Sequence, residues 1–284
     1  MKRLVMILAV PLGVALCAAL LNAAEPVTPV TLKTTEFGHG STIVLLHGLA
    51  SGRMVWMPTA KKLLAGHRVV MVDLPGHGDS PLPDPFSLEA CVAALDQVLA
   101  KQNPDSTVLV AHGMGGLIAL EEVQAHPERV KGLAVIDGSP RAGMKIPEQQ
   151  QQFFFQMMET SYDDVLRRMI RGQSRDTLEA QELLATAQGV PPATVKAYIK
   201  AAMNADASAA LKGMKPAFLF IASERRWPKD KFWATLSRDI GYDGLDSTTA
   251  TRRIAGAGAL IMKQQPDSLA AVVDAFAARA IAKK

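Results

Sequence analysis

Short apolar runs alternate along the chain with longer segments of helical periodicity. The short runs contain four to six residues and are rich in β-branched side chains, as is typical of strands buried on both faces. They are Thr42–Leu46, Arg68–Val72, Thr107–Val110, Gly132–Ile136 and Ala217–Ala222. Strands of this kind, separated by helices, indicate a mostly parallel sheet that is flanked by helices on both faces.

Two of the intervening segments carry clear helix signals. A helix is predicted from about Ser87 to Lys101, because Ser87 can cap its N-terminus and apolar residues recur at helical spacing. A second helix is predicted from Gly116 to Ala125, and it ends before Pro127. Cys91 belongs to the apolar pattern of the first helix, which favours core packing over chemistry for its thiol.

The alternation stops between about Arg141 and Lys215, where every pattern is helical. A helical insert at this point would lie over the carboxyl edge of the sheet, where ligands bind in open α/β folds. We therefore divide the chain after residue 24 into a first core segment (25–140), a helical cap (141–215) and a last core segment (216–284). The apolar residues of the cap form either its own core or the wall of a pocket. They include Phe153, Phe154, Phe155, Met157, Met158, Val165, Met169, Tyr198, Ile199 and Met203.

Residues 1–24 resemble a secretory signal peptide. Lys2 and Arg3 provide the positive start, Leu4–Leu21 forms the apolar run, and Ala23-Ala24 ends a region of small residues suited to cleavage. An uncleaved membrane anchor is the alternative, because the run is near the length that spans a bilayer. The expected location is therefore periplasmic or secreted, with membrane association only if the signal is not cleaved.

The composition is that of a globular protein, with 49% hydrophobic and 20% charged residues and a net charge of +4. No basic stripe is interleaved with aromatic residues, so nucleic-acid binding is not expected. Neither metal ligands at a recognisable spacing nor a phosphate-binding glycine loop is found, so we expect no metal and no cofactor.

Three segments, in matching order, resemble the α/β-hydrolase fold superfamily of serine esterases and lipases. They are Leu45–Leu49, similar to the oxyanion loop, Asp73–Ser80, similar to the turn after the next strand, and Val110–Gly116, similar to the nucleophile elbow. With Trp56 and a helix from Pro266, the resemblance covers roughly residues 37 to 284. It implies a mostly parallel sheet flanked by helices, with a helical cap inserted before the late strands.

The catalytic nucleophile and base of that family are replaced. The family has a serine at the apex of the elbow, whereas this chain has Gly113, which suits the strained turn but offers no atom for attack. The family places its catalytic histidine after the last strand, and the corresponding position here is Ala259. All six histidines lie at or before position 126, so no shift of the alignment supplies an imidazole to accept the proton of a nucleophile.

The position of the catalytic acid is ambiguous. Arg226 stands where the resemblance places an aspartate, and Glu224 is close to it in sequence. Asp137 follows the preceding strand, a position that some family members use for the acid, although it also fits a turn at a strand end.

The remaining parts of the site are retained. The resemblance implies that the backbone N–H groups of Leu49 and Met114 form an oxyanion hole. It also implies that His47, Gly48 and His112 lie at the pocket.

Three functions remain open. The favoured one is a non-catalytic homologue that binds a small apolar or acyl/carboxylate ligand, or a protein partner, under its cap, because two or three triad positions have diverged together. The second is a serine-type carboxylic ester hydrolase that has been inactivated by substitution of its triad. The third is a hydrolase with a different catalytic apparatus, such as a water activated by His47, His77 or His112.

Overall fold

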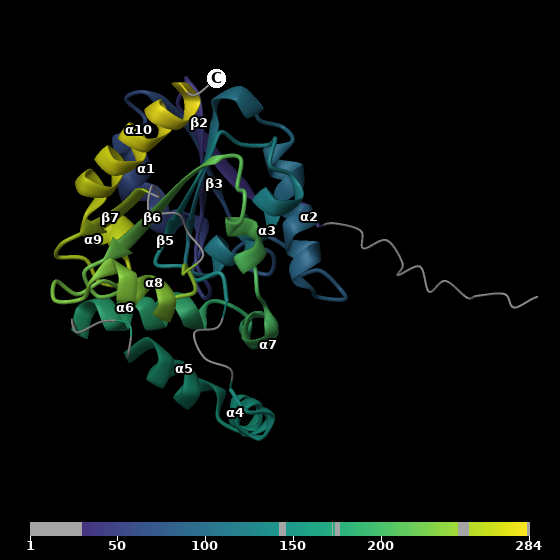
Figure 1. The fold of residues 1–284 in the computed structure, drawn as a ribbon. Coiled ribbons are helices and arrows are strands. Elements are labelled where there is room, and N and C mark those ends of the chain that lie inside the picture. The colour runs from purple at the N-terminus through teal and green to yellow at the C-terminus, as the bar shows by residue number, and fades with distance from the viewer. Residues whose placement is uncertain (1–29, 142–145, 172, 174–176, 244–249, 283–284) are drawn as a thin grey trace, which may run out of the picture.

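A computed structural model describes residues 30–141, 146–171, 173, 177–243 and 250–282 (Figure 1). The predicted signal segment, residues 1–24, lies outside the described residues. Among the residues that are described, no helix is both long enough and apolar enough to cross a membrane.

The described residues form a seven-stranded sheet with the order β1-β3-β2-β4-β5-β6-β7. Strand β1 runs antiparallel to β3, and all other neighbouring strands are parallel. The strands are β1 (Thr34–Phe37), β2 (Ser41–Leu46), β3 (His67–Val72), β4 (Thr107–His112), β5 (Gly132–Ile136), β6 (Ala217–Ser223) and β7 (Ala250–Ile254). The mostly parallel sheet and all five predicted strands are therefore confirmed.

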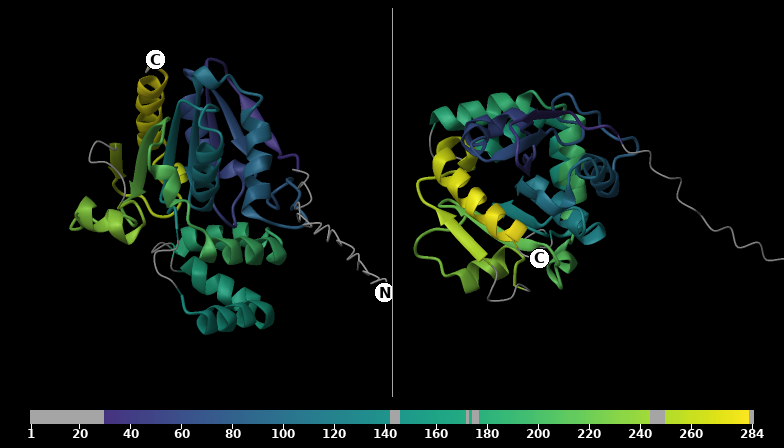
Figure 2. Two further views of the ribbon diagram at one scale, coloured as in Figure 1. Left: turned by 45° about the vertical axis from the view of Figure 1, so that its right-hand side comes forward. Right: turned by 90° about the horizontal axis from the view of Figure 1, so that it is seen from above.

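Helices cover both faces of the sheet (Figures 1 and 2). One face packs on α1 (Met57–Leu63), α9 (Ile261–Gln264) and α10 (Pro266–Ala282). The other packs on α2 (Leu88–Leu99), α3 (Met114–Ala125) and α8 (Trp233–Asp239). Short 3-10 helices occupy Arg53–Trp56, Pro104–Ser106 and Ser208–Leu211.

The two helical layers follow from the alternation of side chains along each strand. In β2, Ile43 and Leu45 join the core beneath α1 and α10, whereas Val44 and Leu46 join the core beneath α2 and α3. The cap of α2 is the predicted one, since the Ser87 hydroxyl accepts the N–H of Ala90 at 3.1 Å. Helix α3 begins at Met114, two residues before its predicted start, because the elbow turns directly into the helix.

Four helices lie between β5 and β6, beyond the carboxyl ends of the strands (Figures 1 and 2). They are α4 (Glu148–Thr160), α5 (Tyr162–Arg171), α6 (Thr177–Gln188) and α7 (Pro192–Asn204). Met158, Val165 and Ile199 are buried in a small core that α4, α5 and α7 share. Phe153 is exposed, and Tyr198 packs in the α2/α3 core of the sheet instead.

Candidate functional site

A cavity of about 770 Å³ lies between the carboxyl edge of the sheet and the helices that follow β5. The loops after β2, β3, β4, β5, β6 and β7 form one side of it. Its other side is mostly apolar and is formed by Leu166, Met169, Ile170, Leu183 and Val195 from α5, α6 and α7. Such a volume is within the range of small-molecule sites in proteins.

The elbow between β4 and α3 has Gly113 at its apex, with φ +53° and ψ −116°. This left-handed region is costly for residues with a Cβ, so glycine fits the turn. A Cβ on Gly113 would meet only the Gly48 Cα, at 3.7 Å, and Gly113 lines the cavity. The apex therefore faces the cavity without a nucleophile.

The two glycines behind the apex are needed for space rather than for conformation. A Cβ on Gly115 would stand 2.4 Å from the carbonyl oxygen of His47, and one on Gly116 would stand 2.7 Å from Val135 Cγ1. The start of α3 is therefore pressed against both the oxyanion loop and β5, as the sharp turn predicts.

Ala259 also lines the cavity, in the turn between β7 and α9. Its carbonyl accepts a hydrogen bond from the ring of His112, which lines the cavity as well. Burial lowers the pKa of His112 even though Asp137 acts in the opposite direction, so the ring is neutral near pH 7. His112 also fills the space beside Gly48, where a Cβ would stand 2.8 Å from its Nδ1.

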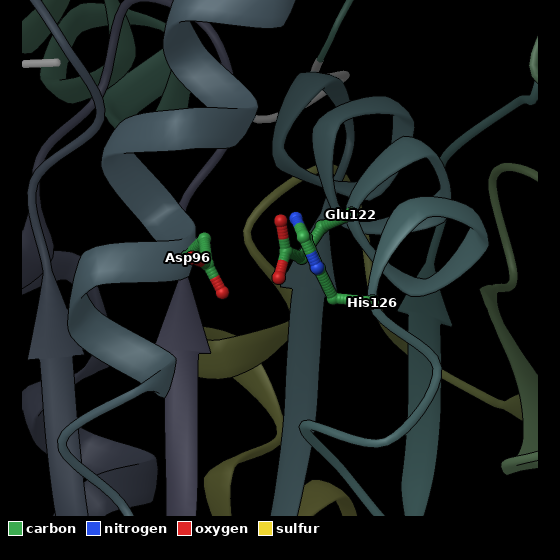
Figure 3. Close-up of side chains that lie close together, drawn as sticks. All are labelled: Asp96, Glu122 and His126. Carbon is green, nitrogen blue, oxygen red and sulfur yellow. The ribbon is translucent and has the colours of Figure 1, made fainter.

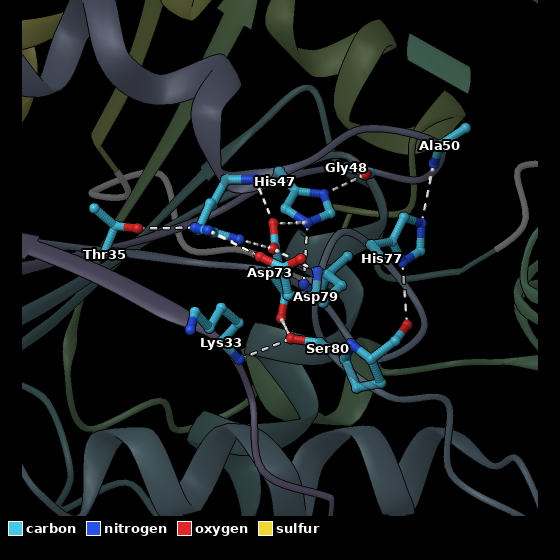
Figure 4. Close-up of polar contacts among 12 residues, drawn as sticks. Lys33, Thr35, His47, Gly48, Ala50, Asp73, His77, Asp79 and Ser80 are labelled. Carbon is cyan, nitrogen blue, oxygen red and sulfur yellow. Dashed lines mark hydrogen bonds and ion pairs between the residues drawn. The ribbon is translucent and has the colours of Figure 1, made fainter. Parts of the chain in front are cut away.

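His47 and His77 are buried outside the cavity and connect two loops (Figure 4). His47 Nδ1 donates to the Gly48 carbonyl at 2.7 Å, and its Nε2 accepts the N–H of Leu74 at 3.0 Å. Burial lowers the pKa of His47 to about 3. His47 was predicted to lie at the pocket; it is absent from the cavity lining, and its ring is used to satisfy the Leu74 amide.

His77 has the same kind of role in the turn after β3. Its Nε2 accepts the N–H of Ala50 at 3.2 Å, and its Nδ1 lies 3.1 Å from the Pro75 carbonyl oxygen. Burial lowers the pKa of His77 too. Both nitrogens of each ring are thus engaged by the backbone, which leaves neither histidine available as a base.

An ion-pair network that the sequence did not predict lies at one end of the cavity (Figure 4). The guanidinium of Arg53 binds the buried carboxylate of Asp73 and, at 3.1 Å, that of Asp79, and its Nε donates to Thr35 Oγ1 at 2.8 Å. The backbone N–H of Arg53 donates to Asp73 Oδ1 at 2.6 Å. Asp73 begins the turn that the sequence singled out, but nothing in the pattern indicated Arg53 as its partner.

The two acidic candidates, Asp137 and Glu224, and the arginine at the position of the acid, Arg226, lie in different surroundings. Asp137 lines the cavity with φ +51°, and its Oδ1 accepts the N–H of Ser223 at 2.8 Å. Its buried Oδ2 has no hydrogen-bond partner among the residues that the structure describes. Glu224 is not among the residues that line the cavity, and it accepts the N–H of Gly256 at 2.8 Å, a hydrogen bond that lowers its pKa.

Arg226 lines the cavity beside these residues. Its Nη2 donates to the hydroxyl of Ser139, and within the described ranges its buried Nε has no hydrogen-bond partner. Burial lowers the pKa of Arg226, and Asp137 partly opposes that effect. Leu49 and Met114 line the cavity as well, and the direction of their backbone N–H groups stays a prediction.

Comparison with known proteins agrees with the fold described above. The model of the alpha/beta hydrolase family matches residues 43–272, which include the elbow, the cap and the turn that carries Ala259. The chain belongs to the alpha/beta hydrolase family. The predicted resemblance and fold are thus confirmed.

Curated relatives of this alpha/beta hydrolase are similar over part of the chain. A pimeloyl-acyl-carrier protein methyl ester esterase from Pseudoalteromonas atlantica is 38% identical over 113 residues, which are 39% of this chain and 42% of that protein. An enzyme of the same name from Edwardsiella ictaluri is 33% identical over 140 residues, 49% of this chain and 53% of that protein. The chain therefore spans about half or less of the length of the curated relatives it matches.

Solved structures of other proteins share the fold. A bromoperoxidase from Bacillus anthracis superposes with a TM-score of 0.74 at 17% identity, covering 88% of this chain and 96% of that chain. A thermophilic esterase from Thermogutta terrifontis has a TM-score of 0.70 at 19% identity, covering 88% and 94%. At these identities the likeness concerns the fold alone.

Away from the cavity of this alpha/beta hydrolase, Asp96 of α2 lies beside Glu122 and His126 of α3 and its C-terminus (Figure 3). Glu122 is fully buried, and neither of its carboxylate oxygens has a hydrogen-bond partner in the described part of the chain. Burial raises its pKa to about 8. Arg129 already binds both oxygens of Asp96, at 2.6 and 3.3 Å. A further cation beside Arg129 would be repelled, so we assign the group to helix packing and not to metal binding.

Proposed function

We propose that this chain is a non-catalytic alpha/beta hydrolase that binds a small apolar or acyl/carboxylate compound in the cavity under its cap. The observation that carries the proposal is the combination of an open cavity of about 770 Å³ with Gly113 and Ala259 at its catalytic positions. Without a hydroxyl at 113 no acyl-enzyme forms there, and without an imidazole at 259 no base or acid serves the reacting atoms.

The hydrogen bonds of the nearby histidines argue against a substitute catalytic base. His47 and His77 have both ring nitrogens engaged by backbone groups, and neither lines the cavity. His112 does line it, but its ring donates to the Ala259 carbonyl and is packed against Gly48. A hydrolase with a different apparatus would need one of these rings to be released.

The cavity wall supports an acyl ligand. The helices of the cap contribute Leu166, Met169, Ile170 and Leu183, which suit an alkyl chain, and no catalytic residue of the family is needed to build this wall. The curated relatives are named for a methyl ester of a pimeloyl group, which is an acyl chain. We therefore extend the acyl class, but not the ester hydrolysis, to this chain.

The test combines a covalent probe, turnover and binding on the purified chain. We expect a fluorophosphonate probe to leave it unlabelled and hydrolysis of p-nitrophenyl octanoate to stay at the buffer rate. We expect octanoate to raise the melting temperature in proportion to the logarithm of its concentration at saturation. Labelling, or turnover above about 1 s⁻¹, would contradict the non-catalytic proposal. If every small ligand leaves the melting temperature unchanged, the proposal of a small-molecule site fails in favour of a protein partner.

We propose further that the chain is exported to the periplasm or the medium. The support is the sequence of residues 1–24, a positive start followed by an apolar run and small residues. N-terminal sequencing of the secreted or periplasmic protein should find a start at about Ala24 or Glu25. An intact Met1 in the membrane fraction would indicate an uncleaved anchor instead.

A further inference from the structure

The charged residues of the cavity are unevenly distributed. Arg53 is paired with Asp73 and Asp79 at one end, and Lys263 is paired with Glu182 beneath the cap. The other charged lining residues are Arg225, Arg226 and Asp137, which lie in the turns after β6 and β5. Arg226 and Asp137 therefore lie at the same end of the cavity, in the turns after two adjacent strands.

Arg226 is the half-buried cation of this end. Its Nη2 is fixed by the hydroxyl of Ser139, a neutral partner, while its buried Nε has no hydrogen-bond partner among the described residues. An arginine withdrawn from water is stabilised by an anion that accepts its N–H groups, and a carboxylate matches the planar guanidinium best. The Ser139 contact holds this group at the cavity wall, so little reorganisation is needed on binding.

We propose that Arg226 binds the carboxylate of the ligand, so that the cavity selects a medium-chain carboxylate anion over neutral compounds of the same shape. This inference rests on the proposed function and names the ligand class of the same site. The alkyl chain lies against Met169, Ile170 and Leu183, on the apolar side of the cavity. The arginine that stands in the position of the family's acid thus becomes the anchor for a ligand.

The carboxylate of Asp137 weakens the preference of the cavity for an anionic ligand. Its Oδ2 is buried at the same end of the cavity, without a hydrogen-bond partner in the part of the chain that the structure describes, and a like charge disfavours an anionic ligand. Its Oδ1 is used by the N–H of Ser223, and an asparagine can keep that hydrogen bond. Asp137→Asn should therefore tighten the binding of an anion without disturbing the turn.

The experiment compares octanoate with octanamide, which has the same chain and shape but no charge, by isothermal titration calorimetry at pH 7. The wild-type chain should bind octanoate at least about tenfold more tightly than octanamide, as a charge-assisted contact predicts. Arg226→Gln should abolish this preference and keep the affinity for octanamide. The control is Arg252→Gln, which removes the same charge from an exposed position that does not line the cavity, and it should behave as the wild type.

The outcomes separate this inference from the proposed function. Equal affinity of the wild type for octanoate and octanamide would overturn the role of Arg226 while leaving the cavity a ligand site. Absence of binding by both compounds would count against the proposed function itself. If Arg226→Gln does not fold, Asp137→Asn decides the question, since it should raise the affinity for octanoate severalfold and leave that for octanamide unchanged.

Discussion

Gly115 lies directly beneath the carbonyl group of His47, so close that a Cβ at position 115 would stand 2.4 Å from the carbonyl oxygen. This contact joins the first turn of α3 to the oxyanion loop after β2. Neither backbone can move away from the other, because each continues from a buried strand. The spacing of the two segments is therefore set by a glycine that takes no part in chemistry.

The first prediction concerns this contact. Gly115→Ala should lower the free energy of unfolding by about 1–3 kcal/mol, the usual cost of inserting a methyl group into a packed interior. Gly66→Ala is the control, because a Cβ at position 66 meets nothing within 4 Å. Urea denaturation measures both. Equal stability of the two variants would show that the elbow is less tightly packed than the contact requires.

The second prediction concerns the conformation of the apex. Gly113→Val should lower the free energy of unfolding by about 1–3 kcal/mol, because a β-branched residue is strained at φ +53° although the space beside it is open. The same denaturation assay applies, with Gly66→Val as the control. A wild-type melting temperature for Gly113→Val would contradict the strained turn.

The third prediction concerns the substitutions that would give the site catalytic activity. Gly113→Ser alone should give no ester hydrolysis, because no imidazole is present at position 259 to accept the serine proton. The variant Gly113→Ser/Ala259→His/Arg226→Asp restores all three residue types, and we expect it to hydrolyse p-nitrophenyl octanoate and to react with a fluorophosphonate probe. Activity of the single serine variant, equal to that of the triple variant, would mean that another group already acts as the base.

The fourth prediction uses the buried Glu122, whose pKa is raised to about 8 by burial. Between about pH 4.5 and pH 8 the folded chain holds a proton that the unfolded chain releases, so this group favours folding at low pH and loses that effect as the pH rises. Glu122→Gln should therefore raise the free energy of unfolding by about 1–3 kcal/mol more at pH 8 than at pH 5. The exposed Glu148→Gln is the control. A pH-independent difference would refute the burial of a titrating carboxyl group.

The fifth prediction concerns the network around Arg53. Asp73→Asn removes the charge of a buried carboxylate that binds both the guanidinium and the backbone N–H of Arg53. We expect a loss of about 1–3 kcal/mol in the free energy of unfolding, because a partly buried cation loses its partner. Asp79→Asn breaks a more exposed contact with the same guanidinium and should change stability by less than about 1 kcal/mol. Similar losses in both variants would contradict the central role of Asp73.

The sequence predicted the five inner strands because each is a continuous apolar run, which parallel strands require when helices cover both faces. It did not predict β1, since Thr34, Thr35 and Glu36 form a short polar edge strand whose only sheet partner is β3. The register of that pairing is a long-range contact with no local signal.

Within the site, positions that follow strand ends were easier to predict than side-chain directions. Gly113 and Asp137 line the cavity because the parallel strands β4 and β5 end at the same edge. His47 and Glu224 do not line the cavity, and each is hydrogen-bonded to a backbone N–H elsewhere in the chain, that of Leu74 and that of Gly256. Such partners are fixed only when the fold brings the segments together.

The chain enters and leaves the four helices over the cavity at neighbouring points. Arg141 and Asp206 form a bridge there, and the N–H of Ala207 donates to the Pro140 carbonyl at 2.8 Å. A chimera could therefore exchange everything between Arg141 and Asp206 for the corresponding cassette of an active esterase while the strand register stays intact. In such a chimera the cap of the esterase would determine which alkyl chain binds, whereas the core of this chain would determine whether the bound group reacts.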